Sequence, residues 1–130
     1  MVPAVKDLST RIIQCDVTMG DTAWTKAKGL MFTRSPRNGD RWNPFCMVFT
    51  FSRPIIIRLH MFFVTYPIDV LVLDAERRVM EKATLLPWRF WNSRMRGQYV
   101  LEVPQGTATR VPLGTRLSWD EKGLRMEKII

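Results

Sequence analysis

The sequence predicts a mainly β protein, α+β at most, built as a small barrel-like antiparallel β domain with one or two short helices. Short runs rich in β-branched and aromatic residues recur at close spacing, and turn-forming residues separate them. Only one stretch has a helical pattern. The 130 residues suit one domain spanning 1–130, and 46% hydrophobic residues exclude a disordered chain.

The first third of the chain predicts one strand, one helix and one loop. Thr10 to Val17 has the β-branched character of a strand. Asp21 suits the N-cap of a helix through Lys28, and Gly29 suits the left-handed position that ends it. Ser35 to Pro44 is rich in Pro, Gly, Asn, Asp and Arg, so we expect a loop there.

The middle of the chain contains the longest apolar runs. Phe45 to Phe51 has the composition of a buried strand, and Ile55 to Val64 is a second strand-like run. Between them, Ser52-Arg53-Pro54 is expected to break the strand.

Four further strands are expected in the second half. Ile68 to Asp74 alternates most clearly, and the polar stretch from Asp74 to Arg78 predicts a hairpin turn into Val79 to Thr84. Tyr99 to Val103 and Thr115 to Trp119 are the last two predicted strands.

The chain is strongly basic, with a formal net charge of +8 and an isoelectric point near 10.2. Such a balance favours anionic partners, although it also serves solubility. The start lacks the apolar stretch of a signal peptide, and Ile55 to Val64 is too short to span a bilayer. We therefore expect a cytoplasmic protein without membrane insertion, with Cys15 and Cys46 reduced.

Three stretches resemble one known family. They are Ala-Trp-Thr-Lys-Ala-Lys-Gly-Leu-Met-Phe-Thr-Arg at 23–34, Pro-Ile-Asp-Val-Leu-Val-Leu-Asp at 67–74, and Tyr-Val-Leu-Glu-Val-Pro-Gln-Gly at 99–106 with Gly114 soon after. Together, over about residues 12–117, they resemble the domain of unknown function 192 family of uncharacterised small bacterial and archaeal proteins. The resemblance implies a compact, barrel-like, mainly β domain, and it implies no established reaction, cofactor or catalytic residue.

One segment departs from that family. Members commonly have Trp-Met-Lys-Asn-Thr before the central strand, whereas His60 to Val64 reads His-Met-Phe-Phe-Val here. Three polar side chains are thus replaced by apolar ones. We expect a packed core strand or a more apolar pocket at this segment.

His60 and Asp69 are the best candidates for acid–base chemistry. His60 is the only histidine and lies in an apolar run, where a histidine is more often a hydrogen-bonded packing residue than a ligand or proton-transfer group. Asp69 shares a strand face with Leu71 and Leu73, so a buried carboxylate there needs donors. It ties a loop or helix N-terminus to the sheet, faces a ligand beside His60, or is simply exposed.

Other catalytic and cofactor sites are not indicated. Glu102 lies between Leu101 and Val103, and we expect it to be exposed or to cap a backbone group. One His, two distant Cys and no carboxylate cluster do not form a metal-ligand set. The glycines match no phosphate-binding spacing, so we expect neither a metal nor a cofactor.

The stretch from Leu86 to Gln98 is predicted as a basic aromatic loop, with three Arg, three aromatic residues and no acidic residue. Arginines pair with phosphates and aromatic rings stack on unpaired bases. Alternatively, the aromatic rings cover the end of the barrel and the Arg stems lie over them. The residues proposed for nucleic-acid binding are Trp88, Arg89, Trp91, Arg94 and Arg96.

Three hypotheses for function follow. The first is a non-enzymatic binding or accessory module for a small molecule or peptide, with a binding site formed by Met31, Arg34, His60, Met61 and Asp69. The second is nucleic-acid binding through the loop at 86–98. The third is a hydrolase or isomerase that uses His60 and Asp69, and it requires the two side chains to lie within hydrogen-bond reach of each other or of one water.

Overall fold

The computed structural model describes residues 10–20, 35–38 and 41–127. The helix expected from Asp21 to Lys28 lies outside these ranges, and so do the predicted site residues Met31 and Arg34. The prediction of a mainly β fold is confirmed. The described residues form ten strands and one short 3₁₀-helix.

The strands in the first half of the chain are β1 (Thr10–Gln14), β2 (Asp16–Gly20), β3 (Arg37–Asn38), β4 (Arg41–Trp42) and the long β5 (Phe45–His60). The second half contains β6 (Ile68–Leu73), β7 (Val79–Leu85), β8 (Phe90–Pro104), the 3₁₀-helix η1 (Ala108–Arg110), β9 (Arg116–Asp120) and β10 (Gly123–Glu127).

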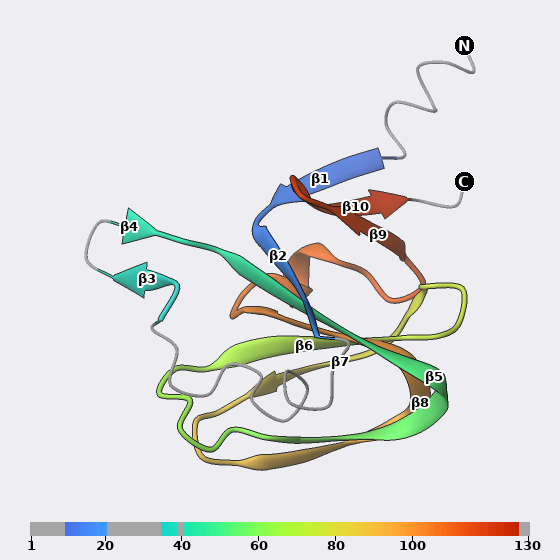
Figure 1. Ribbon diagram of the computed structural model, residues 1–130, viewed down its shortest axis with the longest axis horizontal. Coiled ribbons are helices and arrows are strands. Elements are labelled where there is room, and N and C mark those ends of the chain that lie inside the picture. The colour runs from blue at the N-terminus through green and yellow to red at the C-terminus, as the bar shows by residue number, and fades with distance from the viewer. Residues whose placement is uncertain (1–9, 21–34, 39–40, 128–130) are drawn as a thin grey trace.

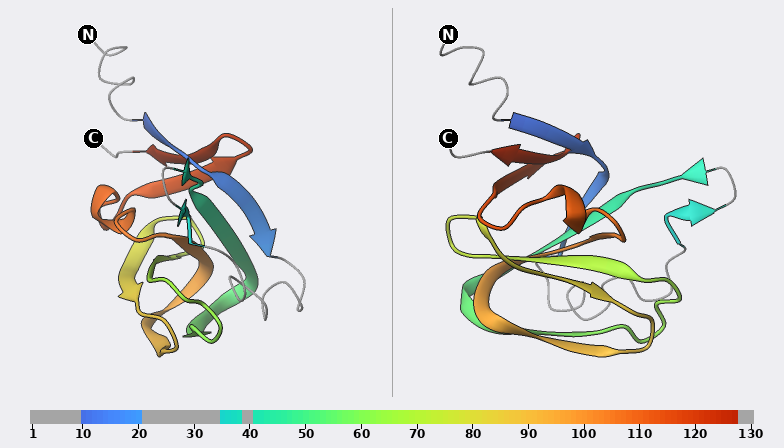
Figure 2. Two further views of the ribbon diagram at one scale, coloured as in Figure 1. Left: turned by 90° about the vertical axis from the view of Figure 1, so that its left-hand side faces the viewer. Right: turned by 180° about the vertical axis from the view of Figure 1, so that it is seen from behind.

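These strands form three sheets and do not close into a barrel (Figure 1). The largest sheet has the order β2-β5-β8-β6-β7, and all its pairs are antiparallel except β2 with β5. A three-stranded sheet, β1-β10-β9, lies over one side of it (Figure 2). The short β3 and β4 pair with each other inside the segment expected to be a loop.

β5 and β8 form a long ribbon that curls back under the rest of the sheet (Figures 1 and 2). The expected break at Ser52-Arg53-Pro54 is wrong, because β5 continues through it with a shift of register between Thr50 and Ile55. Opposite Ile55, Gly97 lets β8 pass close to the core, since a Cβ there would clash with the Val72 side chain. The irregular pairing between Thr50 and Ile55 therefore accommodates Pro54 without ending the strand, and the strand bends there.

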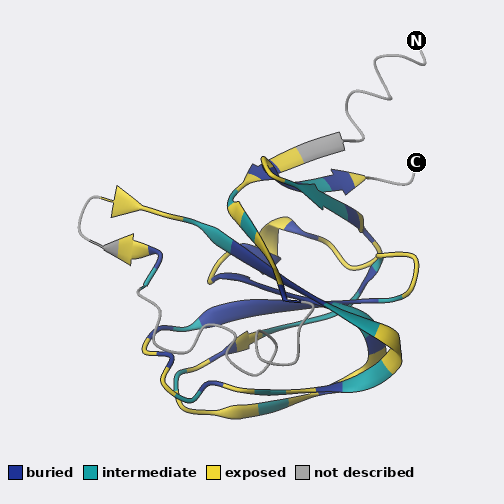
Figure 3. Cartoon of the chain, in the orientation of Figure 1, coloured by how far each residue is buried: buried dark blue, intermediate teal, exposed yellow. Residues whose placement is uncertain are grey.

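The two faces of β6 pack into two different hydrophobic clusters, as the alternation of its sequence predicts. Ile68, Val70 and Val72 belong to the cluster enclosed by the curled ribbon. Leu71 and Leu73 belong to the cluster between the two larger sheets. Every residue of β6 is buried, so this strand forms the centre of the molecule (Figure 3).

One prediction about the second half is wrong, and another is confirmed but incomplete. The stretch 86–98 is not a loop throughout, because β8 begins at Phe90 and pairs with β5 from His60 onwards. The strand expected at 115–119 is present as β9, but it continues through a turn into β10, which the sequence did not indicate. No helix within the described residues is long and apolar enough to cross a membrane.

Candidate functional site

The outer side of the far end of the β5–β8 ribbon carries an unusual set of exposed side chains. Phe90 begins β8 opposite His60 and is 74% exposed. Further along, β8 presents alternating exposed polar residues, and Arg58 of β5 pairs with Asn92. We call this surface the arginine–aromatic face and define it as Arg58, His60, Trp88, Arg89, Phe90, Asn92, Arg94 and Arg96, all of which are exposed.

Backbone hydrogen bonds hold two turns side by side at the end of this face. The Met61 N–H donates to the Arg89 carbonyl at 2.7 Å, and the Trp88 N–H donates to the Met61 carbonyl at 2.8 Å. Phe63 and Trp88 have positive φ angles of 58° and 63°. Bulky residues rarely adopt this region, and such strain is concentrated at functional sites.

The rings around these turns contact one another. Phe62 lies between His60 and Phe90, with ring centroids 5.0 Å and 4.9 Å away, and Phe63 meets Trp88 at 5.0 Å. The His60 ring is further fixed because its Nδ1 accepts a hydrogen bond from the Phe62 N–H at 3.3 Å. Mutual packing therefore orients the rings while leaving Phe90 and Trp88 exposed.

The four arginine side chains of the face, Arg58, Arg89, Arg94 and Arg96, make no ion pair or hydrogen bond within the described part of the chain. The nearest acidic group in the hydrogen-bond network is Glu81. Its carboxylate is occupied by the backbone N–H groups of Arg94 and Met95, at 2.9 to 3.1 Å. The face therefore has positive charge that no described side chain neutralises.

A buried serine fixes the irregular part of the ribbon beneath the face. The Ser93 hydroxyl accepts a hydrogen bond from the Ile57 N–H at 2.9 Å and donates to the Met95 carbonyl at 2.7 Å. These bonds bridge the second register shift between β5 and β8. The bulge is therefore a fixed feature, and it sets where the neighbouring arginines emerge.

Four of the five residues predicted for nucleic-acid binding lie together on this face: Trp88, Arg89, Arg94 and Arg96. Trp91 does not lie on this face. It follows Phe90 in β8, so its side chain points to the opposite side of the strand and packs against the cluster enclosed by the ribbon. Sequence reasoning did not include Arg58 and Phe90 in this site. The sequence signal that could have identified Arg58 is the alternation of Arg58 and His60 with apolar residues, which places both polar side chains on one face of the strand.

Asp69 lies in β6, away from this face, and its carboxylate accepts three hydrogen bonds. It is 1% exposed, and its carboxylate accepts bonds from the Thr84 hydroxyl at 2.7 Å and from the N–H groups of Gly106 and Ala108 at 2.8 and 2.9 Å. The prediction that this carboxylate ties a loop and a helix start to the sheet is confirmed. We call this arrangement the Asp69 corner.

The residues of the first and third hypotheses are not gathered into one site. Asp69 faces the cluster between the sheets, whereas Met61 is buried in the cluster enclosed by the ribbon. His60 bonds to Phe62, and Asp69 bonds to Thr84, Gly106 and Ala108, so the two side chains make no hydrogen bond with each other. Ligand binding by these residues stays a prediction.

The expectation for Glu102 is wrong. It is 7% exposed, and its Oε1 has no hydrogen-bond partner within the described part of the chain. Met47 of β5 and Val70 of β6 flank it on both sides. Burial raises the pKa of Glu102 to about 7, because the charged carboxylate is poorly solvated there.

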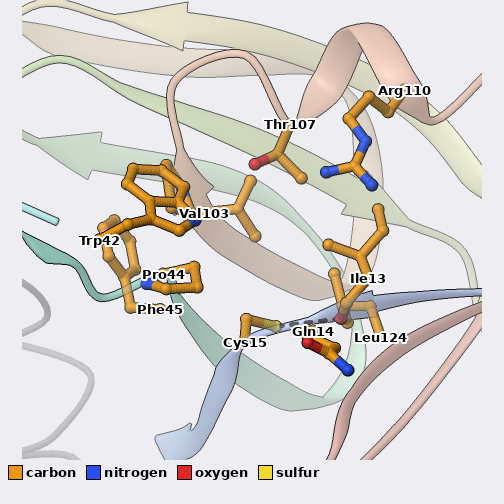
Figure 4. A pocket seen from close by; sticks show the side chains of 11 residues that line it. Ile13, Gln14, Cys15, Trp42, Pro44, Phe45, Val103, Thr107, Arg110 and Leu124 are labelled. Carbon is orange, nitrogen blue, oxygen red and sulfur yellow. Dashed lines mark hydrogen bonds between the residues drawn. The ribbon is translucent and has the colours of Figure 1, made fainter. Parts of the chain in front are cut away.

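A separate hollow lies where β1 meets β2, beside β4 and η1 (Figure 4). A small, partly open cavity of about 30 Å³ is lined by Cys15, Trp42, Thr107 and Arg110 among others. Cys15 and Trp42 also line an adjoining open cleft of about 480 Å³. Within the described residues, no three His, Cys, Asp or Glu side chains are grouped as metal ligands.

Comparison with known proteins gives a consistent set of relatives. The model of the family DUF192, described as "Uncharacterized ACR", matches residues 5–119. A UPF0127 protein of Pyrococcus horikoshii is 32% identical over 108 residues, which cover 80% of this chain and 87% of that protein. A UPF0127 protein of Pyrococcus furiosus is 32% identical over 114 residues, with coverages of 83% and 90%.

Two solved structures are similar. A protein of unknown function from Novosphingobium aromaticivorans has a TM-score of 0.66 and 26% identity, covering 79% of this chain and 74% of that one. A Sinorhizobium meliloti protein described as a candidate transcription regulator has a TM-score of 0.69 and 24% identity, with coverages of 84% and 90%. The second likeness carries the fold alone.

Proposed function

Because this chain belongs to the uncharacterised DUF192 family, its function must be argued from its own surface, and we propose that it binds single-stranded nucleic acid through the arginine–aromatic face. The observation that carries this proposal is the joint exposure of Phe90 and of four arginines without described side-chain partners along the same end of the β5–β8 ribbon.

Unpaired arginines supply the attraction to phosphate. Guanidinium groups bind phosphate oxygens in a two-pronged geometry, and a net charge of +8 adds long-range attraction to a polyanion. Some arginines elsewhere are engaged: Arg125 pairs with Asp120 at 2.9 Å, and Arg77 lies over the rings of Tyr99 and Trp119. The face differs because it combines four arginines that have no described side-chain partner with exposed aromatic rings.

Exposed rings supply the contacts to bases. Phe90 and Trp88 are 74% and 53% exposed, although burying an aromatic ring is favourable. A base stacked on such a ring contributes about 1–3 kcal/mol and does so for every base type. The faces of bases are accessible in a single strand and covered in a duplex, so this surface favours single strands.

The small-molecule or peptide hypothesis has its best support at a different place. The open cleft beside Cys15 and Trp42, at about 480 Å³, is within the size range of ligand pockets. Of the residues predicted for that site and described by the structure, His60, Met61 and Asp69 do not line this cleft, and its described lining lacks the concentration of unpaired charge that marks the arginine–aromatic face. We therefore place nucleic-acid binding first.

Fluorescence anisotropy with a labelled single-stranded RNA of about 12 nucleotides tests the proposal. If four arginines each contact a phosphate, the logarithm of affinity falls with slope about −3 against log salt, or roughly 50-fold between 50 and 200 mM. The variant carrying Arg89→Glu, Arg94→Glu and Arg96→Glu should lose binding by at least about 100-fold.

The matched control reverses three exposed charges away from the face, with Arg110→Glu, Arg116→Glu and Lys122→Glu. It changes the net charge equally and should keep most of the affinity. Equal losses in both triple variants, a flat salt series, or tighter binding to duplex than to single strands would contradict the proposal.

A further inference from the structure

Two thiols meet at the hollow where β1 joins β2. Cys15 lies between these strands, and Cys46 is the second residue of β5, which pairs with β2 in parallel. The pairing of Asp16 with Phe45 and of Val17 with Cys46 places both cysteines at the same end of this ladder. Both contact the cluster between the sheets, and the two thiols lie close enough for each to shift the pKa of the other.

The two thiols differ in access. Cys46 is fully buried, whereas Cys15 is half-buried and lines the small cavity (Figure 4) as well as the open cleft. A small oxidant in the cleft can therefore reach Cys15 but not Cys46. This arrangement of an accessible thiol in contact with a buried one is what internal disulfide formation requires.

We propose that Cys15 and Cys46 form an oxidisable dithiol, in which Cys15 reacts with a peroxide and Cys46 then closes an internal disulfide.

The local hydrogen bonds prepare Cys15 for this reaction. As a thiol, Cys15 donates to the Ile13 carbonyl at 3.6 Å. As a thiolate, it accepts from the Cys46 S–H and from the Leu124 N–H, and the Cys46 bond is the main reason that the pKa of Cys15 is lowered. The same bond and burial raise the pKa of Cys46, which therefore keeps its proton as the donor. The thiolate is the nucleophilic form, so Cys15 is the first to react.

The chemistry balances with hydrogen peroxide as the oxidant. The Cys15 thiolate attacks one peroxide oxygen, an S–O bond forms, the O–O bond breaks, and hydroxide leaves to become water. Cys15 is now a sulfenic acid, oxidised by two electrons. The Cys46 sulfur attacks the Cys15 sulfur, the S–S bond forms, and the hydroxyl leaves with the Cys46 proton as a second water. Two thiols and one peroxide thus give one disulfide and two waters.

Mass spectrometry of the full chain treated with hydrogen peroxide tests this proposal. The expected product is a monomer lighter by about 2 Da, with both thiols lost together and restored by a dithiol reductant. Digestion without reduction should yield one peptide pair that links Cys15 to Cys46. Stepwise gain of about 16 Da without that link, or disulfide-bonded dimers, would overturn the proposal.

Single variants separate the two roles. Cys15→Ser should leave Cys46 unreactive, while Cys46→Ser should stop at a sulfenic acid on Cys15 that dimedone traps. Cys46→Ala is the matched partner of Cys46→Ser, since serine can still donate a hydrogen bond and alanine cannot. The pH at which Cys15 is half-alkylated by iodoacetamide should be higher in Cys46→Ala than in Cys46→Ser. Identical pH profiles, or a Cys46 that reacts first, would overturn the assignment.

Discussion

The Asp69 corner and the arginine–aromatic face use their charged groups in opposite ways. At the corner, one carboxylate accepts three hydrogen bonds from a hydroxyl and two backbone N–H groups, and it is buried. On the face, four guanidinium groups are exposed and bond to nothing in the described part of the chain. A charged group whose hydrogen bonds are all made within the molecule stabilises the fold, whereas unpaired charged groups beside exposed rings are available to bind a partner.

The largest expected effect comes from removing the carboxylate of the corner. Asp69→Ala leaves the buried N–H groups of Gly106 and Ala108 without acceptors and should lower the free energy of unfolding by about 4 kcal/mol. Thr84→Ala removes only one of the three bonds and should cost about 1 kcal/mol. Urea unfolding measures both. A loss below 1 kcal/mol in Asp69→Ala would show that the corner does not support the fold.

Glu102 makes the comparison more specific, because it is buried like Asp69 but one of its oxygens has no hydrogen-bond partner among the described residues. Its pKa is raised from 4.5 to about 7 in the folded protein, so the folded state holds the proton more tightly than the unfolded state. Stability should therefore fall as the pH rises from about 4.5 through 7, by about 3 kcal/mol in total, and level off above.

Glu102→Gln removes this titration while keeping the side chain's size. Its free energy of unfolding relative to wild type should rise by about 3 kcal/mol between pH 4 and pH 8. Chemical denaturation at several pH values measures the difference. Parallel pH profiles for the two proteins would mean that Glu102 is solvated or paired in solution.

The smallest expected effect concerns a single ring of the face. Phe90→Ala should weaken binding of single-stranded RNA about tenfold, because one stacking contact is lost. It should leave unfolding almost unchanged, since the ring is mostly exposed. Leu113→Ala, at another exposed apolar residue, is the control and should leave affinity unchanged. Unchanged affinity in Phe90→Ala would show that the ring contacts no base.

The features that were predicted correctly from the sequence are those that depend only on neighbouring residues within one strand. Alternation along Ile68 to Leu73 assigned both faces of β6, and it placed Asp69 where a buried carboxylate needs donors. Glu102 was misjudged because β8 packs against a hydrophobic cluster on each of its faces: Leu101 and Val103 belong to one cluster and Val100 belongs to the other. Alternation within one strand cannot reveal which strands cover it.

The candidate site was only partly predicted, because its composition depends on strand pairing as well as on local sequence. The basic and aromatic composition of 86–98 pointed to the correct region, but β8 pairing from Phe90 decides which side chains face outward. That pairing turns Trp91 inward and adds Arg58 from a strand about thirty residues earlier. The contact between Cys15 and Cys46 likewise depends on the parallel pairing of β2 with β5, which no local pattern indicates.

Backbone amide NMR of the full chain, titrated with single-stranded RNA, tests the central claim most directly. We expect chemical-shift changes concentrated at Arg58, His60 and residues 88–96, which weaken as salt is raised, while the amide signals of Gly106 and Ala108 at the Asp69 corner do not move. Shifts centred instead on the cleft around Cys15 and Trp42, or no shifts at low salt, would contradict binding through the arginine–aromatic face.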